Sequence, residues 1–398
     1  MIPDGIRGVL LISNLEFGGA QRQVVELANS MDPARVDLHV CSLSDYVPLA
    51  EALDDRARRL HVIEKRWKFD VTVVPRLARL LRALRADLVH SYLFDADIAA
   101  RLAGRLARTP LVVGSERNTN YHLKRRQLVA YRLTRSCVDI IVANSRSGAA
   151  FNQRALGHAA SQYRVVHNGV NAERFSPQDG RAVRAELGIA ADERVVGMFA
   201  SFKHQKNHPL FFAAASRVLR SRPATRLLLV GDELFAGLHG SDEYKQRIHR
   251  LVDEIGLRDR CLFLGNRSDV ARLYSACDVT VMPSLFEGTP NAVLESLACG
   301  VPVVATDVSD NAYLVPEACV GYVVPLGNEE ALADRISRLL GDGELRREMG
   351  RRAREWVEQE FSTARLAAKT AMVYREALDP KRGGRSGVRA VGQVPCNR

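Results

Sequence analysis

The alternation of short apolar runs with amphipathic stretches constrains this fold more than any other feature of the sequence. In the first half, apolar runs at 9–13, 36–42, 88–90, 111–114, 140–144 and 164–167 alternate with helical patterns at 21–31, 74–84, 97–107 and 124–135. In the second half, runs at 195–200, 226–231, 261–264, 279–282 and 301–306 alternate with helical patterns at 209–220, 244–255 and 290–298. This order predicts βαβ units and parallel sheets with helices on both faces. The predicted fold class is therefore α/β, with two Rossmann-like doubly wound sheets.

The chain length and one polar cluster predict where these sheets divide. A chain of 398 residues is too long for one ordinary core and suits two domains. Asn168, Gly169, Asn171 and Pro177 lie together at the centre, and such a cluster is typical of a connection between domains. We expect an N-terminal domain at 1–170, a second domain with closing C-terminal helices at 171–378, and a flexible basic tail at 379–398.

The positive charge is confined to parts of the chain. The formal net charge is +11, but residues 1–170 hold 25 basic and 16 acidic side chains, whereas residues 171–378 hold 27 and 29. The last twenty residues hold 5 basic and 1 acidic. This one-sided excess predicts an anionic partner, such as phospholipid headgroups or a phosphorylated acceptor. Nucleic acid is not expected, because aromatic residues are only 6% and none interleave with the basic run.

Targeting and cysteine patterns bear on the compartment. The N-terminus lacks a charged-then-apolar signal pattern, and no run of eighteen apolar residues occurs. The seven cysteines include no C-x-x-C pair and mostly lie beside apolar residues, which favours reduced thiols over a disulfide framework or a zinc site. We expect a cytoplasmic protein, with peripheral contact at the inner membrane face as a further option.

The segment from Phe286 to Thr306 is the most informative motif. It follows the apolar run at 279–282, and Pro290 opens a helical pattern, which predicts an anion-binding helix N-terminus. Glu287 precedes that turn, and Glu295 lies about two turns further on the same side. Two carboxylates that accept hydrogen bonds from diols, with a phosphate site between them, match the shape of a nucleoside diphosphate-sugar.

This segment resembles the E-x7-E signature of the retaining glycosyltransferases of family 4, including the Gly-x-Pro-Val-Val strand that follows it. The resemblance covers nearly the whole chain to about residue 378. It implies the GT-B fold, in which two Rossmann-like domains face across a cleft and the C-terminal domain binds most of the donor. It also implies transfer of a hexose-type sugar with retention, from a nucleotide-sugar donor to a saccharide or lipid-linked acceptor, without a metal or other cofactor.

The same resemblance assigns the donor side of the site. It implies that Glu287 contacts the sugar hydroxyls, Glu295 contacts the ribose, and Lys206 binds phosphate. The remaining donor-side positions are the turn Gly288, Thr289, Pro290 and Asn291, the base-packing residues Asn266 and Arg267, and the cation Lys203. Many relatives carry an arginine at the position of Ser201, so Lys203 is expected to take that role.

The acceptor side is assigned in part by resemblance and in part from the predicted topology. Gly18 and Gly19 are similar to the family's Gly-Gly loop, near the acceptor and the donor phosphates. Tyr92 stands where many relatives have the second histidine of a His-x-His pair, so that histidine is replaced by a tyrosine that can still donate a hydrogen bond. Ser115, Arg117 and Asn118 follow the run at 111–114, and either acceptor binding or a simple capping turn explains them.

Three other patterns have structural alternatives. Asp95-Ala96-Asp97 matches a metal-binding D-x-D signature but also the start of a helix, and we favour the cap and predict no metal site. His204 and His208 lack a carboxylate at ligand spacing, so we do not expect them to bind a metal. The basic set on one helical pattern is either a solvated face or a contact for membrane or acceptor phosphate; it consists of Lys124, Arg125, Arg126, Arg132 and Arg135.

Other functions compete with this assignment. A nucleotide-sugar epimerase on the same fold would interconvert sugars without an acceptor. A dehydrogenase is disfavoured because no G-x-G-x-x-G opens a helix after an early strand. A non-enzymatic scaffold that docks on membrane through residues 101–146 and the tail would not bind a nucleotide sugar saturably.

Overall fold

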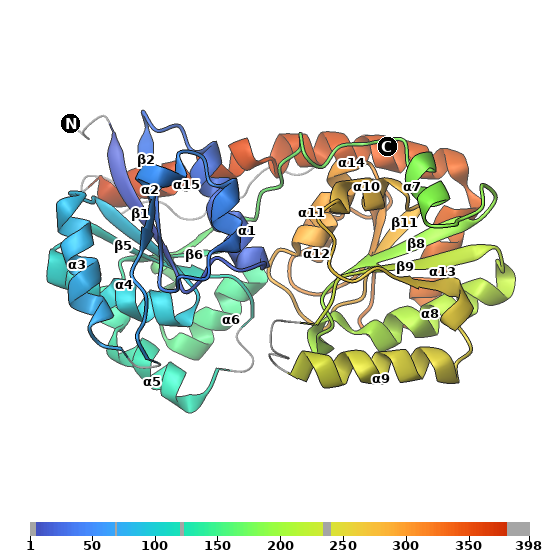
Figure 1. The fold of residues 1–398 in the computed structure, drawn as a ribbon, viewed down its shortest axis with the longest axis horizontal. Helices are drawn as coiled ribbons and strands as arrows, with labels where there is room; N and C mark the ends of the chain where they lie inside the picture. Colours follow the sequence, from blue (N-terminus) through green and yellow to red (C-terminus); the bar gives the residue numbers. More distant parts are fainter. Residues whose placement is uncertain (1–4, 68–69, 120–122, 234–239, 380–398) are drawn as a thin grey trace. The chain divides into compact units, whose positions relative to one another are not determined.

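The computed structural model of the chain describes residues 5–67, 70–119, 123–233 and 240–379. The chain forms two compact units that divide between Gly169 and Val170 (Figure 1). Unit 1 holds the residues up to Gly169 and the helix that begins at Thr363, and unit 2 holds Val170–Ser362.

Unit 1 is built on a sheet of seven parallel strands in the order β3-β2-β1-β4-β5-β6-β7. Its strands are β1 (Ile6–Ile12), β2 (Val36–Ser42), β3 (Leu60–Val62), β4 (Leu88–Tyr92), β5 (Leu111–Glu116), β6 (Ile140–Ala143) and β7 (Tyr163–Val165). Its helices are α1 (Gly19–Ser30), α2 (Arg56–Arg59), α3 (Val73–Ala83), α4 (Phe94–Ala107), α5 (Arg125–Leu133), α6 (Arg146–Leu156) and α15 (Thr363–Leu378). The strand order reverses between β1 and β4, and this switch point is where doubly wound sheets bind ligands.

The central strand of unit 1 is apolar on both sides, as a parallel sheet between two helix layers requires. Leu10 packs into the cluster that α1 and α15 share, whereas Val9 and Leu11 pack into the cluster of α3 and α4. Because successive side chains point to opposite faces, one short apolar run serves both layers.

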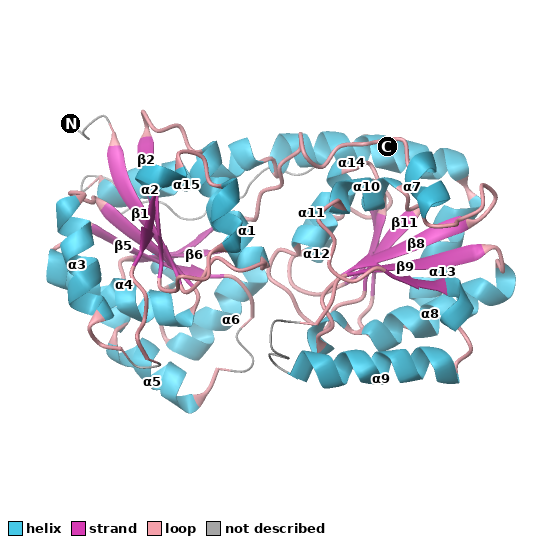
Figure 2. Ribbon diagram, in the orientation of Figure 1, coloured by secondary structure: helices cyan, strands magenta, loops and turns pink. Residues whose placement is uncertain are grey.

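Unit 2 repeats this design with six parallel strands in the order β10-β9-β8-β11-β12-β13, again with helices on both faces (Figure 2). Its strands are β8 (Arg194–Phe199), β9 (Thr225–Val230), β10 (Cys261–Phe263), β11 (Val279–Met282), β12 (Val303–Thr306) and β13 (Gly321–Val324). Its helices are α7 (Arg181–Glu186), α8 (His208–Ser221), α9 (Ser241–Glu254), α10 (Val270–Ser275), α11 (Asn291–Ala298), α12 (Asn311–Leu314), α13 (Glu329–Gly341) and α14 (Gly343–Glu360). The strand order reverses between β8 and β11.

The structure confirms the two parallel α/β sheets and differs from the sequence-based description in two respects. The edge strands β3 and β13 are three and four residues long and were not predicted. Helix α15 was expected in the second domain but belongs to unit 1, because Leu366, Ala367 and Tyr374 are buried in the core of that unit. Residues 380–398 of the tail predicted at 379–398 lie outside the described residues.

Two other expectations can be compared with the structure. None of the described helices has the apolar length that crossing a bilayer demands. Free thiols are present at Cys41, Cys137, Cys261, Cys277 and Cys299.

The histidine that follows α6 makes stability depend on pH. His158 is 3% exposed, and neither ring nitrogen has a hydrogen-bond partner among the described residues. Burial, and then the charge of Arg101, lowers the pKa of His158 to about 4. The unfolded chain therefore binds a proton at this histidine below about pH 6.5, whereas the folded chain binds it only below about pH 4. The free energy of unfolding consequently decreases as the pH falls through this window.

Replacing His158 with Phe should remove this dependence. We expect the His158→Phe variant to gain on the order of 1 kcal/mol in the free energy of unfolding, relative to the natural chain, between pH 7 and pH 5. Urea unfolding at pH 7, 6 and 5 measures it. Parallel pH profiles for the two chains would contradict the assignment.

Candidate functional site

In unit 2, the loops that leave β8 and β11 meet at the switch point of the sheet. The loop after β8 forms a short 3₁₀ turn, His204–Lys206, and Asn207 then adopts a left-handed conformation (φ 53°) that starts α8. Asparagine tolerates this conformation better than most residues. The loop after β11 carries Ser284 and Glu287 to the same place, where the Gln205 carbonyl accepts the Leu285 amide at 2.8 Å.

Glu287 is the centre of this junction. Its side chain is 7% exposed, and its Oε1 accepts hydrogen bonds from Lys206 Nζ at 2.6 Å and from Ser284 Oγ at 2.7 Å. Its Oε2 accepts from Gln205 Nε2 at 3.3 Å. A carboxylate held by a cation and two neutral donors keeps one orientation. Glu287 and Lys206, which the sequence analysis named for separate roles, are in direct contact.

Lys203 and Lys206 bring two ammonium groups to the start of α8. Burial, and then the charge of Lys206, lowers the pKa of Lys203. Repulsion between two partly buried cations is relieved when an anion binds between them. The expected role of Lys203 as a second phosphate-binding cation stays a prediction.

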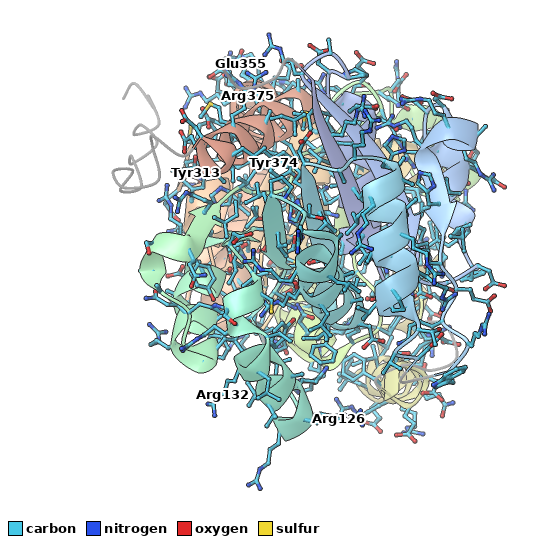
Figure 3. The ribbon with its side chains drawn as sticks, turned by 90° about the vertical axis from the view of Figure 1, so that its left-hand side faces the viewer. Arg126, Arg132, Tyr313, Glu355, Tyr374 and Arg375 are labelled. Atoms are coloured by element: carbon cyan, nitrogen blue, oxygen red, sulfur yellow. The ribbon has the colours of Figure 1, made fainter. Side chains whose placement is uncertain are left out.

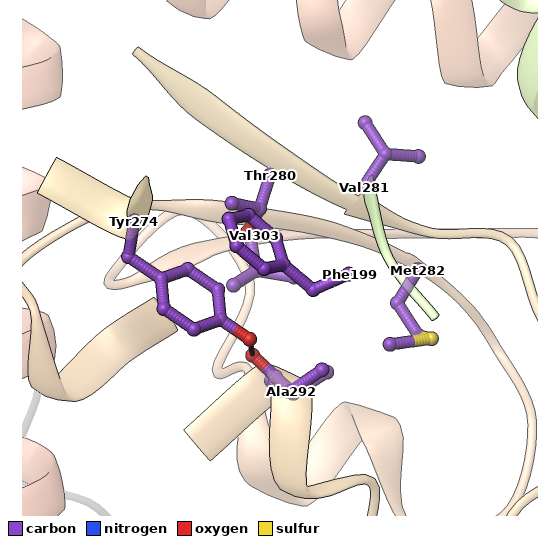
Figure 4. A pocket seen from close by; sticks show the side chains of 8 residues that line it. Phe199, Tyr274, Thr280, Val281, Met282, Ala292 and Val303 are labelled. Carbon is purple, nitrogen blue, oxygen red and sulfur yellow. Dashed lines mark hydrogen bonds between the residues drawn. The ribbon is translucent and has the colours of Figure 1, made fainter. Parts of the chain in front are cut away.

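Glu295 lies on the buried side of α11 and is 6% exposed. Its Oε2 accepts a hydrogen bond from the Tyr274 hydroxyl at 3.0 Å, and Tyr274 stacks on Phe199 with ring centroids 3.7 Å apart. Figure 4 shows Tyr274 and Phe199 in a small cavity of about 10 Å³ that α11 and the sheet line together. The phenol and the ring beneath it therefore fix the orientation of the Glu295 carboxylate.

The turn between the two glutamates supports the N-terminus of α11. Thr289 is buried, the Gly288 carbonyl accepts a hydrogen bond from Ser309 Oγ at 3.0 Å, and Pro290 is the N-cap residue. Gly300 (φ 71°) follows the end of α11, a conformation that suits glycine. The first helical turn from Asn291 onward presents backbone amides at the positive end of the helix dipole.

The loop predicted to pack on the nucleotide base follows β10. The carbonyl of Gly265 accepts the Gly231 amide at 2.9 Å, which joins this loop to the end of β9. Arg267 is ion-paired with Asp269 at 2.8 Å on the exposed surface. Asn266 lies between these two fixed points, at the carboxyl end of the sheet, and contact of Asn266 and Arg267 with a base stays a prediction.

In unit 1, the predicted acceptor-side residues all lie at the carboxyl ends of strands. Gly18 is the N-cap residue of α1 after β1, and Gly19 begins that helix. Tyr92 is the last residue of β4, Ser115 lies in β5, and Arg117 and Asn118 follow β5. The Asn118 carbonyl accepts a hydrogen bond from Asn152 Nδ2 at 3.2 Å, and Asn118 Oδ1 accepts one from the Thr119 amide. Such local hydrogen bonds are typical of a capping turn, which is the alternative to acceptor binding.

A buried network surrounds Tyr92. Nδ1 of His90 lies 2.6 Å from the Tyr374 hydroxyl and 3.4 Å from the Tyr92 hydroxyl, and Nε2 lies 2.7 Å from Ser115 Oγ. Burial, and then Arg117, lowers the pKa of His90 to about 3, so the imidazole is neutral. Sequence reasoning missed Tyr374, because a tyrosine in an amphipathic helix 284 positions away carries no signal of this contact.

The D-x-D match has a structural role. Asp97 is buried, accepts from Ser91 Oγ at 2.7 Å, and is ion-paired with Arg101 at 3.0 Å. Asp95 is ion-paired with Lys65 at 2.6 Å. The two carboxylates thus have separate cationic partners, and the described residues contain no group of three histidine, cysteine or acidic side chains placed to hold a metal ion.

Comparison with known families matches both halves of the chain. Residues 17–174 match the model of Glycosyltransferase Family 4, and residues 179–356 match that of Glycosyl transferases group 1. The two matches meet close to the division between unit 1 and unit 2.

Individual relatives support the same assignment. The chain is 31% identical to a D-inositol 3-phosphate glycosyltransferase of Streptomyces bingchenggensis, over 73% of this chain and 67% of that protein. It is 25% identical to the UDP-Gal:alpha-D-GlcNAc-diphosphoundecaprenol alpha-1,3-galactosyltransferase of Escherichia coli, over 82% and 86%. Among solved structures, Anabaena Alr3699/HepE in complex with UDP-glucose superposes with a TM-score of 0.80 at 22% identity, over 92% and 99%. The chain therefore belongs to glycosyltransferase family 4, with the GT-B fold, and is a glycosyltransferase that uses a nucleotide-sugar donor.

Proposed function

We propose that this enzyme transfers a hexose-type sugar, with retention of configuration, to a lipid-linked or surface-polysaccharide precursor. The observation that carries the proposal is the contact between Glu287 and Lys206 at the switch point of unit 2, with Glu295 two turns along the same segment. The Escherichia coli relative is named for a diphosphoundecaprenol-linked acceptor, which supports an acceptor of this class.

The donor-side residues divide the work of transfer. Lys206 and Lys203, with the amides at the start of α11, stabilise the negative charge that develops on the leaving diphosphate. Glu287 binds the sugar hydroxyls, and Glu295 binds the ribose hydroxyls. Hydrogen bonds set the orientations of Glu287, Lys206 and Glu295 before the donor arrives, so these groups need little reorganisation during the reaction.

The acceptor side is proposed to rest on an anionic membrane through α5. The basic set lies on α5 and directly beside it and is exposed throughout; it consists of Lys124, Arg125, Arg126, Arg132 and Arg135. Val129 and Leu133 on the same helix are also exposed, by 53% and 77%. Arg126 and Arg132 project outward from the helix (Figure 3). Basic and apolar side chains interleaved on one helix face suit the interface of an anionic bilayer.

Nucleotide-sugar binding and hydrolysis test the donor assignment. We expect saturable binding of one nucleotide sugar from a panel of UDP-, GDP- and ADP-hexoses, measured by calorimetry. Glu295→Ala should weaken nucleotide binding by about tenfold or more, because charge-assisted hydrogen bonds to the ribose are lost. If that variant keeps nucleotide affinity and activity, the site is misassigned, and sugar interconversion without an acceptor would identify an epimerase instead.

Glu287 and Lys206 should act on turnover more than on folding. We expect Lys206→Met and Glu287→Gln each to lower the rate of donor turnover by about 100-fold. Release of the nucleoside diphosphate from whichever donor of the panel binds measures that rate. Glu329→Gln is the matched control, because it breaks an exposed ion pair with Arg217 in the same unit. Equal losses in the control and in the site variants would rule out a specific role.

Vesicle binding tests the α5 surface. Reversing two charges with Arg126→Glu and Arg132→Glu should weaken sedimentation with phosphatidylglycerol vesicles by about tenfold or more at low salt. The control pair Arg220→Glu and Arg250→Glu changes the net charge equally on unit 2. The proposal fails if both pairs have the same effect, or if binding does not depend on anionic lipid.

A further inference from the structure

Arg117 is a partly buried cation held by neutral groups. Its guanidinium carbon lies 5.5 Å from the centroid of the Tyr92 ring, and its Nη2 donates a hydrogen bond to Asn168 Oδ1. Asn144 Nδ2 lies 3.4 Å from the same Asn168 oxygen and donates to the Arg117 carbonyl at 3.2 Å. The guanidinium is therefore fixed by residues that follow or end β4, β6 and β7, at the ligand-binding end of the sheet.

This cation lacks a counter-charge. No carboxylate of the described residues pairs with Arg117, and its Nε is buried without a hydrogen-bond partner. Arg101 of the same unit is also buried and has Asp97 at 3.0 Å. A guanidinium remains protonated in proteins, so its charge is not removed by burial and calls for an anion.

The aromatic ring of Tyr92, and not its hydroxyl, faces Arg117. Its hydroxyl turns back toward His90, at 3.4 Å from Nδ1, while Arg117 lies over the ring. Burial raises the pKa of Tyr92 to about 12, so the phenol is neutral and does not compensate the guanidinium. The cavity that these three side chains line is about 10 Å³, about the size for one water molecule, so a larger ligand must reach Arg117 from its partly exposed side.

We infer that Arg117 binds an anionic group of the acceptor, a phosphate or a carboxylate, and that the Tyr92 ring is the platform that orients it. The inference rests on the proposed function, because it takes unit 1 as the acceptor side. The planar fork of a guanidinium matches the two oxygens of either anion. The donor diphosphate is the other source of such an anion, and Lys203 and Lys206 of unit 2 are assigned to it.

Inorganic phosphate and succinate are the probes, used with the full chain at constant ionic strength and followed by calorimetry. We expect saturable binding of at least one probe to the natural chain, and at least tenfold weaker binding to Arg117→Gln. The affinity for UDP should change less than twofold. Arg154→Gln, on the exposed side of α6, is the matched control and should bind both probes normally.

Two substitutions at Tyr92 distinguish the role of the ring from that of the hydroxyl. They also test the inference if the Arg117→Gln variant does not fold. Tyr92→Phe keeps the platform and should retain probe affinity, whereas Tyr92→Leu should lower it to the level of the Arg117 variant. The inference is wrong if the natural chain binds neither probe, or if Arg117→Gln binds them unchanged. Loss of UDP affinity in Arg117→Gln would assign the guanidinium to the donor diphosphate instead. Absence of nucleotide-sugar binding by the natural chain would overturn the proposed function, which is a separate result.

Discussion

The ion pair between Lys206 and Glu287 joins the two strands at which the sheet of unit 2 reverses its order. Both groups are largely buried, with side-chain exposures of 17% and 7%. Taking two charges out of water costs more than their attraction returns unless further hydrogen bonds satisfy them, and Ser284 and Gln205 supply those bonds. Such a pair contributes little net stability. Its consequence is positional, because it holds a cation and a carboxylate in fixed places at the ligand-binding end of the sheet.

The strand order of unit 1 follows the same pattern as that of unit 2. At its switch point, however, the charged groups are arranged differently. The end of β4 carries a neutral histidine whose two ring nitrogens face hydroxyls of Tyr374 and Ser115. Helix α15 supplies Tyr374, so the segment that returns to unit 1 at Thr363 is tied to the strand that ends in Tyr92. Arg117 is a charged group close to this neutral histidine, and no carboxylate of the described residues pairs with it. Within the part of the chain that the structure describes, unit 2 thus presents a cation paired with a carboxylate, and unit 1 presents a cation that no carboxylate pairs with.

The sequence predicted the parts of this structure that depend on local pattern. Apolar runs of four to seven residues marked most strands, and the strand–turn–helix context of Pro290 placed both glutamates in the loop and helix where they lie. The edge strands β3 and β13 were not predicted, although β7, β10, β11 and β12 are equally short and were predicted, so strand length alone does not account for the two omissions. Helix α15 was misassigned because periodicity shows that a helix has an apolar face and does not show which core receives it. The network of Tyr92, Arg117 and Asn168 joins three separate strand ends, and no pattern in the sequence reveals that these side chains meet.

The two departures from the family pattern change different properties of the site. At position 201, where many relatives are expected to carry an arginine, this chain has a serine, and Lys203, which is predicted to take its role, carries an ammonium instead of a guanidinium. An ammonium is a point charge whose pKa responds to its surroundings, whereas arginine keeps its charge and binds through a planar fork. The depressed pKa of Lys203 follows from burial beside Lys206, so an anion bound between the two lysines raises that pKa again and takes up charge there. At Tyr92 the histidine is replaced by a ring that stays neutral and can stack. A planar, permanently charged guanidinium is present in unit 1 at Arg117.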